Sequence, residues 1–313
     1  MEQLTALANF NSLIEMLETL PTDTACREYL EGVIWKGTPA CPHCKSVNSY
    51  KLTTKGIFNG QYKCGDCKER YNVKDGTMFE GTHIGLKKWF IAIYVFSLHK
   101  KGISSYQLAS DLAITQQTAW YLLGRIRLAF KPASMRVLKG KIQCDETYVG
   151  GKTRNMHKAK RDMVYAAGTG AVHMNPVFGM VNEGNVIAIP VEETNGRTLQ
   201  PIIMNQVERG ATVVTDGHGA YAGLNRHFKH EVINHEAGEF ARGQFNTNGI
   251  ENFWSHLKRG IYGIYHHASG KHLHRYCDEF AFRYNFRKNT VNEKFNFPLQ
   301  NSQRLMYKVL IAK

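Results

Sequence analysis

The sequence has no long hydrophobic run. Its longest apolar stretch, residues 89–98, falls well short of the roughly 20 residues that a membrane-spanning helix needs. The first residues, Met1-Glu2-Gln3, also lack the basic start of a secretory signal peptide. These two absences predict a cytoplasmic protein that has no membrane partner.

Acidic residues are scarce relative to basic ones. The 313 residues include 26 Asp plus Glu against 40 Lys plus Arg, which gives a formal net charge of +14. The basic excess is spread along the chain, and this favours a partner that presents negative charge over an extended surface. Nucleic acid is the first candidate, although a basic ribosomal or membrane-surface protein would have the same charge.

Internal repeats and low-complexity segments are also absent, and the length allows two or three domains. Residues 1–36 have the apolar spacing of a helical lead-in, and residues 37–75 have the short alternating stretches of small β-hairpins. Residues 84–133 return to helical spacing. Residues 135–289 alternate strands with helices, and residues 290–313 are expected to form a tail. The predicted fold class is therefore α/β, preceded by a small β module and a helical segment.

Cysteine occurs only seven times, and four of the seven form two CxxC pairs separated by 19 residues. The four are Cys41, Cys44, Cys64 and Cys67. A hairpin can bring the pairs together, and four thiolates at one point suit a structural, tetrahedral Zn²⁺. Two disulfides or a redox pair are the alternative, which the cytoplasmic setting disfavours. Cys26, Cys144 and Cys277 are expected to be buried thiols.

The helical segment has the pattern of a helix-turn-helix. Ser104 or Ser105 can cap one helix, and Thr115 can cap a second after a tight turn at Ala113-Ile114. A plain helical hairpin would show the same apolar spacing. Several side chains of the second helix could contact DNA bases and phosphates. They are Gln116, Gln117, Tyr121, Arg125 and Arg127.

Two aspartates follow β-like stretches in the α/β region. Residues 141–151 predict a strand that ends at a glycine pair, with Asp145 on one face and Glu146 on the other, and residues 211–216 predict a strand that ends at Asp216. Carboxylates at the strand ends of an α/β sheet can hold hard cations such as Mg²⁺. A single aspartate in such a place is more often a turn residue, so the pair needs a third member.

Residues 248–260 supply a candidate for that third member. Their apolar positions predict a helix on which Glu251 and Lys258, two turns apart, share a polar face. If Asn248 is the N-cap, Glu251 occupies the third helical position, where it could simply complete a capping box. Capping does not explain the adjacent cations Lys258 and Arg259, and capping and catalysis can coexist.

The segment between Gly151 and Pro176 is predominantly basic, with five Lys or Arg against one acid. Lys152 and Arg154 could contact phosphates beside the aspartates. A solvated charge run is the commoner meaning of such a stretch.

These motifs together resemble the DDE transposases of bacterial insertion sequences, specifically family fifteen-ninety-five, which is ISXO-like. The resemblance spans residues 35–287 and is carried by the two CxxC pairs and by short motifs in a specific order. These motifs are Lys101-Gly-Ile-Ser104, Asp145-Glu-Thr-Tyr-Val-Gly-Gly151, Thr215-Asp-Gly217, Ile250-Glu-Asn-Phe-Trp-Ser255, Leu257-Lys-Arg-Gly260 and Tyr265-His-His267. The resemblance implies a zinc ribbon, a helix-turn-helix-like segment and an RNase H-like catalytic domain.

The same resemblance implies roles for individual residues. Asp145, Asp216 and Glu251 become the ligands of two catalytic Mg²⁺ ions, which Mn²⁺ could replace, and Lys258 steadies the DNA end. Some members have Asn in the third place, which makes Asn248 the alternative to Glu251. Arg259 is expected to contact DNA.

The implied activity is metal-dependent cleavage at the element ends of double-stranded DNA, followed by joining of the 3′ hydroxyl to target DNA. A homodimer or larger synaptic assembly in a bacterial cytoplasm, associated with the nucleoid, is expected with it. Two alternatives stay open, a catalytically inactive zinc-ribbon DNA-binding regulator and an RNase H-like nuclease without strand transfer.

Overall fold

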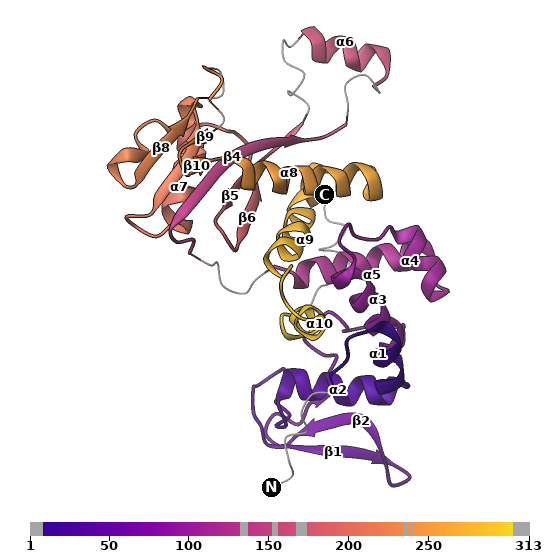
Figure 1. Cartoon of the computed structure of the whole chain (residues 1–313). Coiled ribbons are helices and arrows are strands. Elements are labelled where there is room, and N and C mark those ends of the chain that lie inside the picture. Colours follow the sequence, from indigo (N-terminus) through magenta and orange to yellow (C-terminus); the bar gives the residue numbers. More distant parts are fainter. Residues whose placement is uncertain are drawn as a thin grey trace. The chain divides into compact units, whose positions relative to one another are not determined.

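The chain folds into two compact units, which are described separately. A computed structural model describes residues 9–131, 137–151, 156–166, 174–234, 237–239 and 241–302. The N-terminal unit comprises Met1–Pro132 together with Lys288–Lys313, and the sheet unit comprises Ala133–Arg287 (Figure 1). The sheet unit is therefore inserted in sequence between two parts of the N-terminal unit. No described helix has the length and apolar character needed to span a bilayer.

The N-terminal unit is mainly helical. Its helices are α1 Leu13–Thr19, α2 Asp23–Trp35, α3 Leu86–Leu98, α4 Ser105–Leu112, α5 Gln116–Ala129 and α10 Val291–Gln300. Their interior contains an aromatic cluster in which the ring of Phe295 lies 5.1 Å from that of Phe10 and 5.5 Å from that of Phe90. Since Phe295 belongs to α10, the segment expected as a tail contributes a helix to the core of this unit.

A small antiparallel sheet follows α2 in the sequence. Its strands are β1 Ser49–Thr54, β2 Ile57–Cys64 and β3 Arg70–Tyr71, in the order β1-β2-β3. Tyr62 and Tyr71 pair across β2 and β3 and stack with ring centroids 5.6 Å apart, against Trp35 at the end of α2. This confirms the small β module.

Helices α4 and α5 form as their capping residues predict. The Ser104 hydroxyl accepts a hydrogen bond from the Gln107 amide, and the Thr115 hydroxyl accepts one from the Thr118 amide. Between the helices, Ala113 adopts a left-handed conformation with φ of 48°, which ends α4 without a glycine. The two-helix pattern and its tight turn are therefore confirmed.

The sheet unit is built on a five-stranded mixed sheet in the order β6-β5-β4-β7-β8. The strands are β4 Lys141–Val149, β5 Asn175–Val181, β6 Val186–Pro190, β7 Thr212–Asp216 and β8 Lys229–Ile233. Strand β5 is antiparallel to both of its neighbours, β4 and β6, whereas β4, β7 and β8 run parallel to one another. A short hairpin of β9 Ala241–Arg242 and β10 Phe245–Asn246 precedes the next helix.

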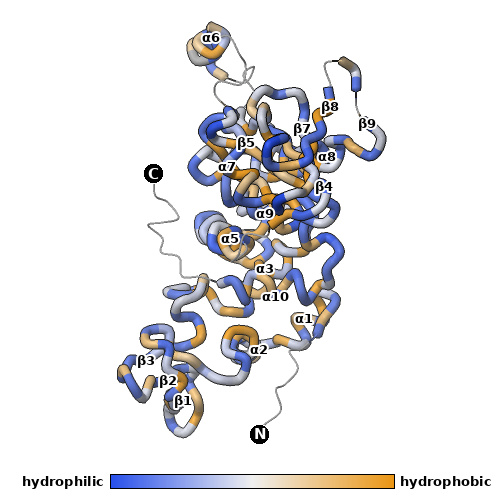
Figure 2. The backbone as a smooth tube through the Cα atoms, turned by 90° about the vertical axis from the view of Figure 1, so that its left-hand side faces the viewer, coloured by the Kyte–Doolittle hydropathy of each residue, from blue (hydrophilic) through white to orange (hydrophobic). Residues whose placement is uncertain are grey.

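Helices cover both faces of this sheet, which confirms the α/β class. The described helices are α6 Lys158–Ala166, α7 Gly196–Gln206, α8 Asn248–Gly260 and α9 Leu273–Asn285, with 3-10 turns at Gly219–Tyr221, Leu224–Arg226 and Gly270–His272 and a π-turn at Ile261–Tyr265. Ile142 and Cys144 of β4 pack in the cluster that contains α7, and Val149 packs in the cluster that contains α8 and α9. Figure 2 shows hydrophobic stretches among the central strands and hydrophilic connections around them.

Candidate active site

Asp145 and Asp216 lie opposite each other on neighbouring strands. The parallel pairing of β4 with β7 includes Gln143 and Val214, and each aspartate stands two residues further along its strand. Paired positions of parallel strands share a face, and the strands lie about 4.8 Å apart. Asp216 ends β7 as expected, but Asp145 does not end β4, because β4 continues to Val149 in its hairpin with β5. The two aspartates nevertheless stand at matching positions of neighbouring strands where β7 stops.

Helix α8 crosses the same face of β4 and is held there by two hydrogen bonds. The Gln143 side-chain Oε1 accepts from the Ile250 amide at 3.0 Å, and the Asp145 Oδ2 accepts from the Trp254 indole Nε1 at 2.9 Å. Odd-numbered residues of β4 thus face α8. This docking brings the first turn of α8, which contains Glu251, toward Asp145.

The start of α8 differs from the expected capping box. The helix begins at Asn248 with Thr247 as N-cap, and the Glu251 amide donates to the Thr247 carbonyl at 3.1 Å. Asn248 is therefore the first helical residue rather than the cap, and Glu251 is the fourth. Its carboxylate accepts from the Thr247 hydroxyl at 2.7 Å instead of closing a capping box. The Gln143 side chain, distant in sequence, takes over part of the capping.

The pKa of Asp145 also reflects the proximity of the other two acids. The pKa of Asp145 is raised from 3.8 to about 6, mainly by burial and in smaller part by the negative charges of Asp216 and Glu251, while the hydrogen bonds from Trp254 and from the Glu146 backbone lower it. Asp216 is half-buried, and its Oδ1 accepts from the His218 amide at 3.1 Å. Glu251 is exposed at the surface of α8. A cation beside Asp145 would therefore relieve mutual repulsion among these carboxylates.

The three carboxylates fit a magnesium site by their chemistry. They supply only hard oxygen donors, which Mg²⁺ combines with water ligands. Their three ligand oxygens do not all lie within 4.8 Å of one another. Among the residues that the structure describes, only the ligand atoms of the cysteine cluster lie that close together.

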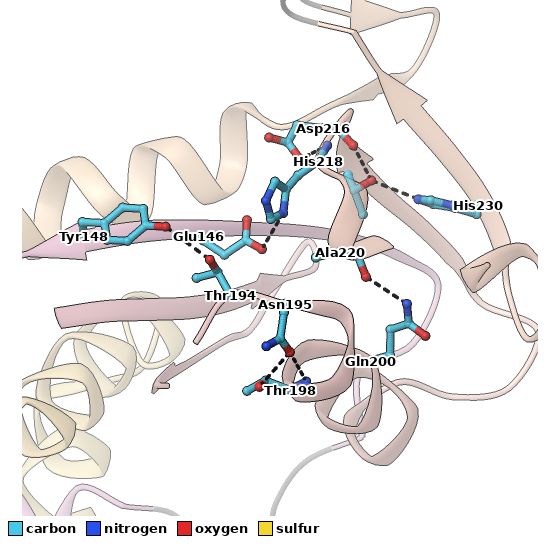
Figure 3. Close-up of polar contacts among 11 residues, drawn as sticks. Glu146, Tyr148, Thr194, Asn195, Thr198, Gln200, Asp216, His218, Ala220 and His230 are labelled. Carbon is cyan, nitrogen blue, oxygen red and sulfur yellow. Dashed lines mark hydrogen bonds and ion pairs between the residues drawn. The ribbon is translucent and has the colours of Figure 1, made fainter. Parts of the chain in front are cut away.

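The opposite face of β4 contributes a residue that sequence reasoning left unassigned, Glu146. Its Oε1 lies 3.8 Å from the Nδ1 of His218, which comes from the loop after Asp216 (Figure 3). The pKa of Glu146 is raised to about 7, mainly by burial and also by the charges of Asp145 and Asp216, against the lowering effect of the Tyr221 hydroxyl. The sequence could have indicated this residue, because side chains alternate along a strand and Glu146 therefore lies on the face opposite to Asp145.

The four cysteine sulfurs converge in the β module. All lie within 4.8 Å of one another, with Cys41 Sγ 3.6 Å from Cys67 Sγ and Cys44 Sγ 3.5 Å from Cys64 Sγ. Tetrahedral Zn²⁺ with bonds of about 2.3 Å separates its sulfurs by about 3.8 Å, so the cluster fits zinc.

Each CxxC pair ends in the same kind of turn. The following residues, Lys45 and Lys68, have φ of 64° and 62°. Between the two pairs, the Gly65 amide donates to the Asn48 carbonyl at 2.7 Å, and the Asn48 side chain donates to Asp66 at 2.8 Å. These contacts tie the two halves of the cluster together. The remaining cysteines, Cys26, Cys144 and Cys277, are buried, as expected.

Two of the arginines predicted to contact DNA are buried instead. Arg125 is 6% exposed, and its guanidinium donates to the carbonyls of Met78 and Glu80 and to the Tyr121 hydroxyl. Arg127 is 4% exposed, with its guanidinium over the Phe96 ring. Their burial gives both arginines an internal structural role and disfavours a contact with DNA, because a guanidinium can bind buried carbonyls or aromatic rings as well as phosphates.

The other predicted contacts have varied surroundings. Gln117 is exposed at the start of α5, whereas the Gln116 side chain donates to the Ser105 hydroxyl at 2.8 Å. On α8, Lys258 is half-buried and Arg259 is exposed. Lys152 and Arg154 lie outside the described residues.

Comparisons with known proteins match both units. The ISXO2-like transposase domain matches residues 137–285, and the transposase zinc-ribbon domain matches residues 21–70. A Halobacterium salinarum protein, "Uncharacterized protein in transposable element ISH50", is 26% identical over 254 residues, which cover 78% of this chain and 85% of that protein. An "Uncharacterized transposase-like protein" of Haemophilus influenzae is 34% identical over 101 residues, which cover 32% of this chain and 80% of that protein.

A solved structure is also similar to the chain, a pre-cleavage Mos1 transpososome. It shares 12% identity, with a TM-score of 0.20, over 65% of this chain and 75% of that one.

Proposed function

Because the chain belongs to the family of ISXO2-like transposases with a zinc ribbon, we propose that it cleaves DNA at insertion-sequence ends and joins the freed 3′ hydroxyl to target DNA. The observation that supports this most is the position of Asp145 and Asp216, opposite each other on β4 and β7, with Glu251 docked above β4 on α8. Asn248 is the alternative third residue. Glu251 is preferred because its charge acts on Asp145.

The proposed chemistry consists of two substitutions at phosphorus. Water attacks the phosphorus at the element end, the bond to the 3′ oxygen breaks, and that oxygen leaves as a hydroxyl. The hydroxyl then attacks a target phosphodiester, forms a new ester bond and releases a target 3′ hydroxyl. When bound, Mg²⁺ or Mn²⁺ activates the attacking oxygen and stabilises the leaving one.

The residues of the chain position these groups. Asp145, Asp216 and Glu251 hold the cations and balance their charge. Lys258, two turns beyond Glu251 on α8, attracts the phosphodiester. Since both steps exchange oxygens on phosphorus, positioning and charge neutralisation supply most of the catalysis.

The partner is double-stranded DNA at the element ends and at the target, bound by at least two copies of the chain. Gln117 and Gln116 at the start of α5 are proposed to contact the DNA, together with Arg259, Lys152 and Arg154. The cysteine cluster binds structural zinc. The bacterial cytoplasm, near the nucleoid, is the proposed site of action.

A strand-transfer assay on element-end DNA with Mg²⁺ tests this proposal. Asp145→Asn, Asp216→Asn and Glu251→Gln should each reduce both cleavage and joining by roughly 100-fold or more. Glu183→Gln, which removes one exposed charge in the turn between β5 and β6, is the matched control and should be fully active.

Three outcomes would contradict parts of the proposal. Full activity of Glu251→Gln with loss of activity in Asn248→Ala would move the third ligand to Asn248. Cleavage without joining would indicate a nuclease. Specific DNA binding that needs no divalent metal, without any cleavage, would indicate a regulator.

A further inference from the structure

The geometry points to Trp254 as a positioning residue that orients the Asp145 carboxylate, with Gly179 providing the space that its indole ring needs. This inference rests on the proposed role of Asp145 as a metal ligand. It assigns to Trp254, one of the two buried aromatic residues of α8, a function beyond its packing in the core.

The first observation is the hydrogen bond itself. The Trp254 Nε1 donates to the Asp145 Oδ2 at 2.9 Å, and the two residues are 109 positions apart in the sequence. Trp254 is 5% exposed, so its ring has little freedom to turn away. An indole N–H can only donate. It therefore fixes one lone-pair direction of Oδ2, and with the hydrogen bond from the Glu146 backbone it sets the orientation in which the carboxylate meets a cation.

The second observation is the absence of a side chain at Gly179. Gly179 of β5 pairs directly with Asp145 of β4. A Cβ at this position would lie 2.5 Å from the Cζ2 of Trp254 and 2.8 Å from the Cδ1 of Ile250. Its backbone is not in the left-handed region, so glycine is needed here for space rather than for conformation. The indole ring thus lies across β5 beside the residue whose carboxylate it contacts.

The third observation is the match in spacing between β4 and α8. Gln143 and Asp145, two strand residues apart, contact Ile250 and Trp254, one helical turn apart. Two strand residues span about 6.6 Å and four helical residues about 6 Å, so both bonds form without distortion. Because Gln143 holds the start of α8 independently, loss of the Trp254 bond should disturb the carboxylate without undocking the helix.

The metal-free protein allows a direct test by NMR of ¹⁵N-labelled tryptophan. The chain has four tryptophans, and Trp254→Phe identifies the Trp254 indole signal by its disappearance. Asp145→Asn should shift this signal, and Mg²⁺ should shift it in the wild type but not in Asp145→Asn. An indole signal that ignores both Asp145→Asn and Mg²⁺ would overturn the inference.

Metal titration of DNA cleavage tests the consequence. Trp254→Phe removes the donor and should raise the half-saturating Mg²⁺ concentration by about tenfold, with partial recovery of the rate at high Mg²⁺. Gly179→Ala should do the same by displacing the ring. The double variant should resemble Trp254→Phe in its Mg²⁺ requirement, because phenylalanine lacks the indole atoms that would collide with the new methyl group. The collision with Ile250 Cδ1 remains and should lower only the melting temperature.

Two controls separate positioning from stability. Gly184→Ala adds a methyl group where no atom lies within 4 Å, and should change nothing. Leu257→Ala removes a buried side chain of α8 and should lower the melting temperature without changing the Mg²⁺ requirement. If Trp254→Phe behaves like Leu257→Ala, Trp254 only packs the core. If Asp145→Asn itself retains wild-type cleavage, the proposed function fails instead.

Discussion

Replacing Phe295 by Ala should destabilise the N-terminal unit, although residue 295 follows the sheet unit in the sequence. Phe295 is fully buried, and its ring contacts those of Phe10, Phe90 and Tyr29 at centroid distances of 5.1, 5.5 and 6.1 Å. Removal of a buried phenylalanine costs roughly 3–5 kcal/mol through lost transfer energy and the cavity left behind. We expect about 4 kcal/mol, because at least three aromatic neighbours would border the cavity.

Urea unfolding followed by circular dichroism measures this cost. With a slope of about 2 kcal/mol per molar, the transition of the N-terminal unit should move down by about 2 M urea. Phe297→Ala on the same helix is the control, and it should cost less than half as much because Phe297 is partly exposed. A shift below about 0.5 M for Phe295→Ala would refute the assignment of α10 to this core.

Three further predictions concern other parts of the chain. Cys64→Ser should lose the zinc measured by atomic absorption and disorder the β module, and retention of one zinc per chain would contradict the cluster. In metal-free buffer, Glu146→Gln should gain stability relative to wild type between pH 5 and 8. Because the pKa of Glu146 is about 7 in the folded protein and 4.5 in the unfolded chain, the folded wild type holds a proton that it loses as the pH rises. Its free energy of unfolding should therefore fall by on the order of 3 kcal/mol over this range. An equal change in the melting temperatures of wild type and variant between the two pH values would exclude this. Gly260→Ala should lower the melting temperature, since its Cβ would collide with the Cζ of Phe280 and lie 2.6 Å from its Cε1. Gly263→Ala, with no atom within 4 Å, should not, and equal melting of the two variants would contradict this packing.

Features that depend on near neighbours in the sequence could be predicted from it. The caps at Ser104 and Thr115 and the turn between their helices follow from local hydrogen bonds and were confirmed. The cysteine cluster was predictable because four thiols in two CxxC pairs with this spacing have few uses other than binding a metal ion. The alternation of strands with helices was sufficient for the α/β class.

Features that depend on distant partners could not be predicted. The position of Trp254 over Gly179 requires the register between β4 and β5, which no local pattern specifies. For the same reason Gln143 was not identified as the residue that caps α8, and the helix start was placed one residue too late. The burial of Arg125 depends on carbonyls more than 40 residues away.

The central claim is that Asp145 and Asp216 hold a common divalent cation. Crystals grown with Mn²⁺, with diffraction recorded at the manganese absorption edge, would locate that ion directly. We predict an anomalous peak about 2.1 Å from a carboxylate oxygen of each aspartate. A manganese ion bound by only one of them, or bound elsewhere while both carboxylates stay free, would contradict it.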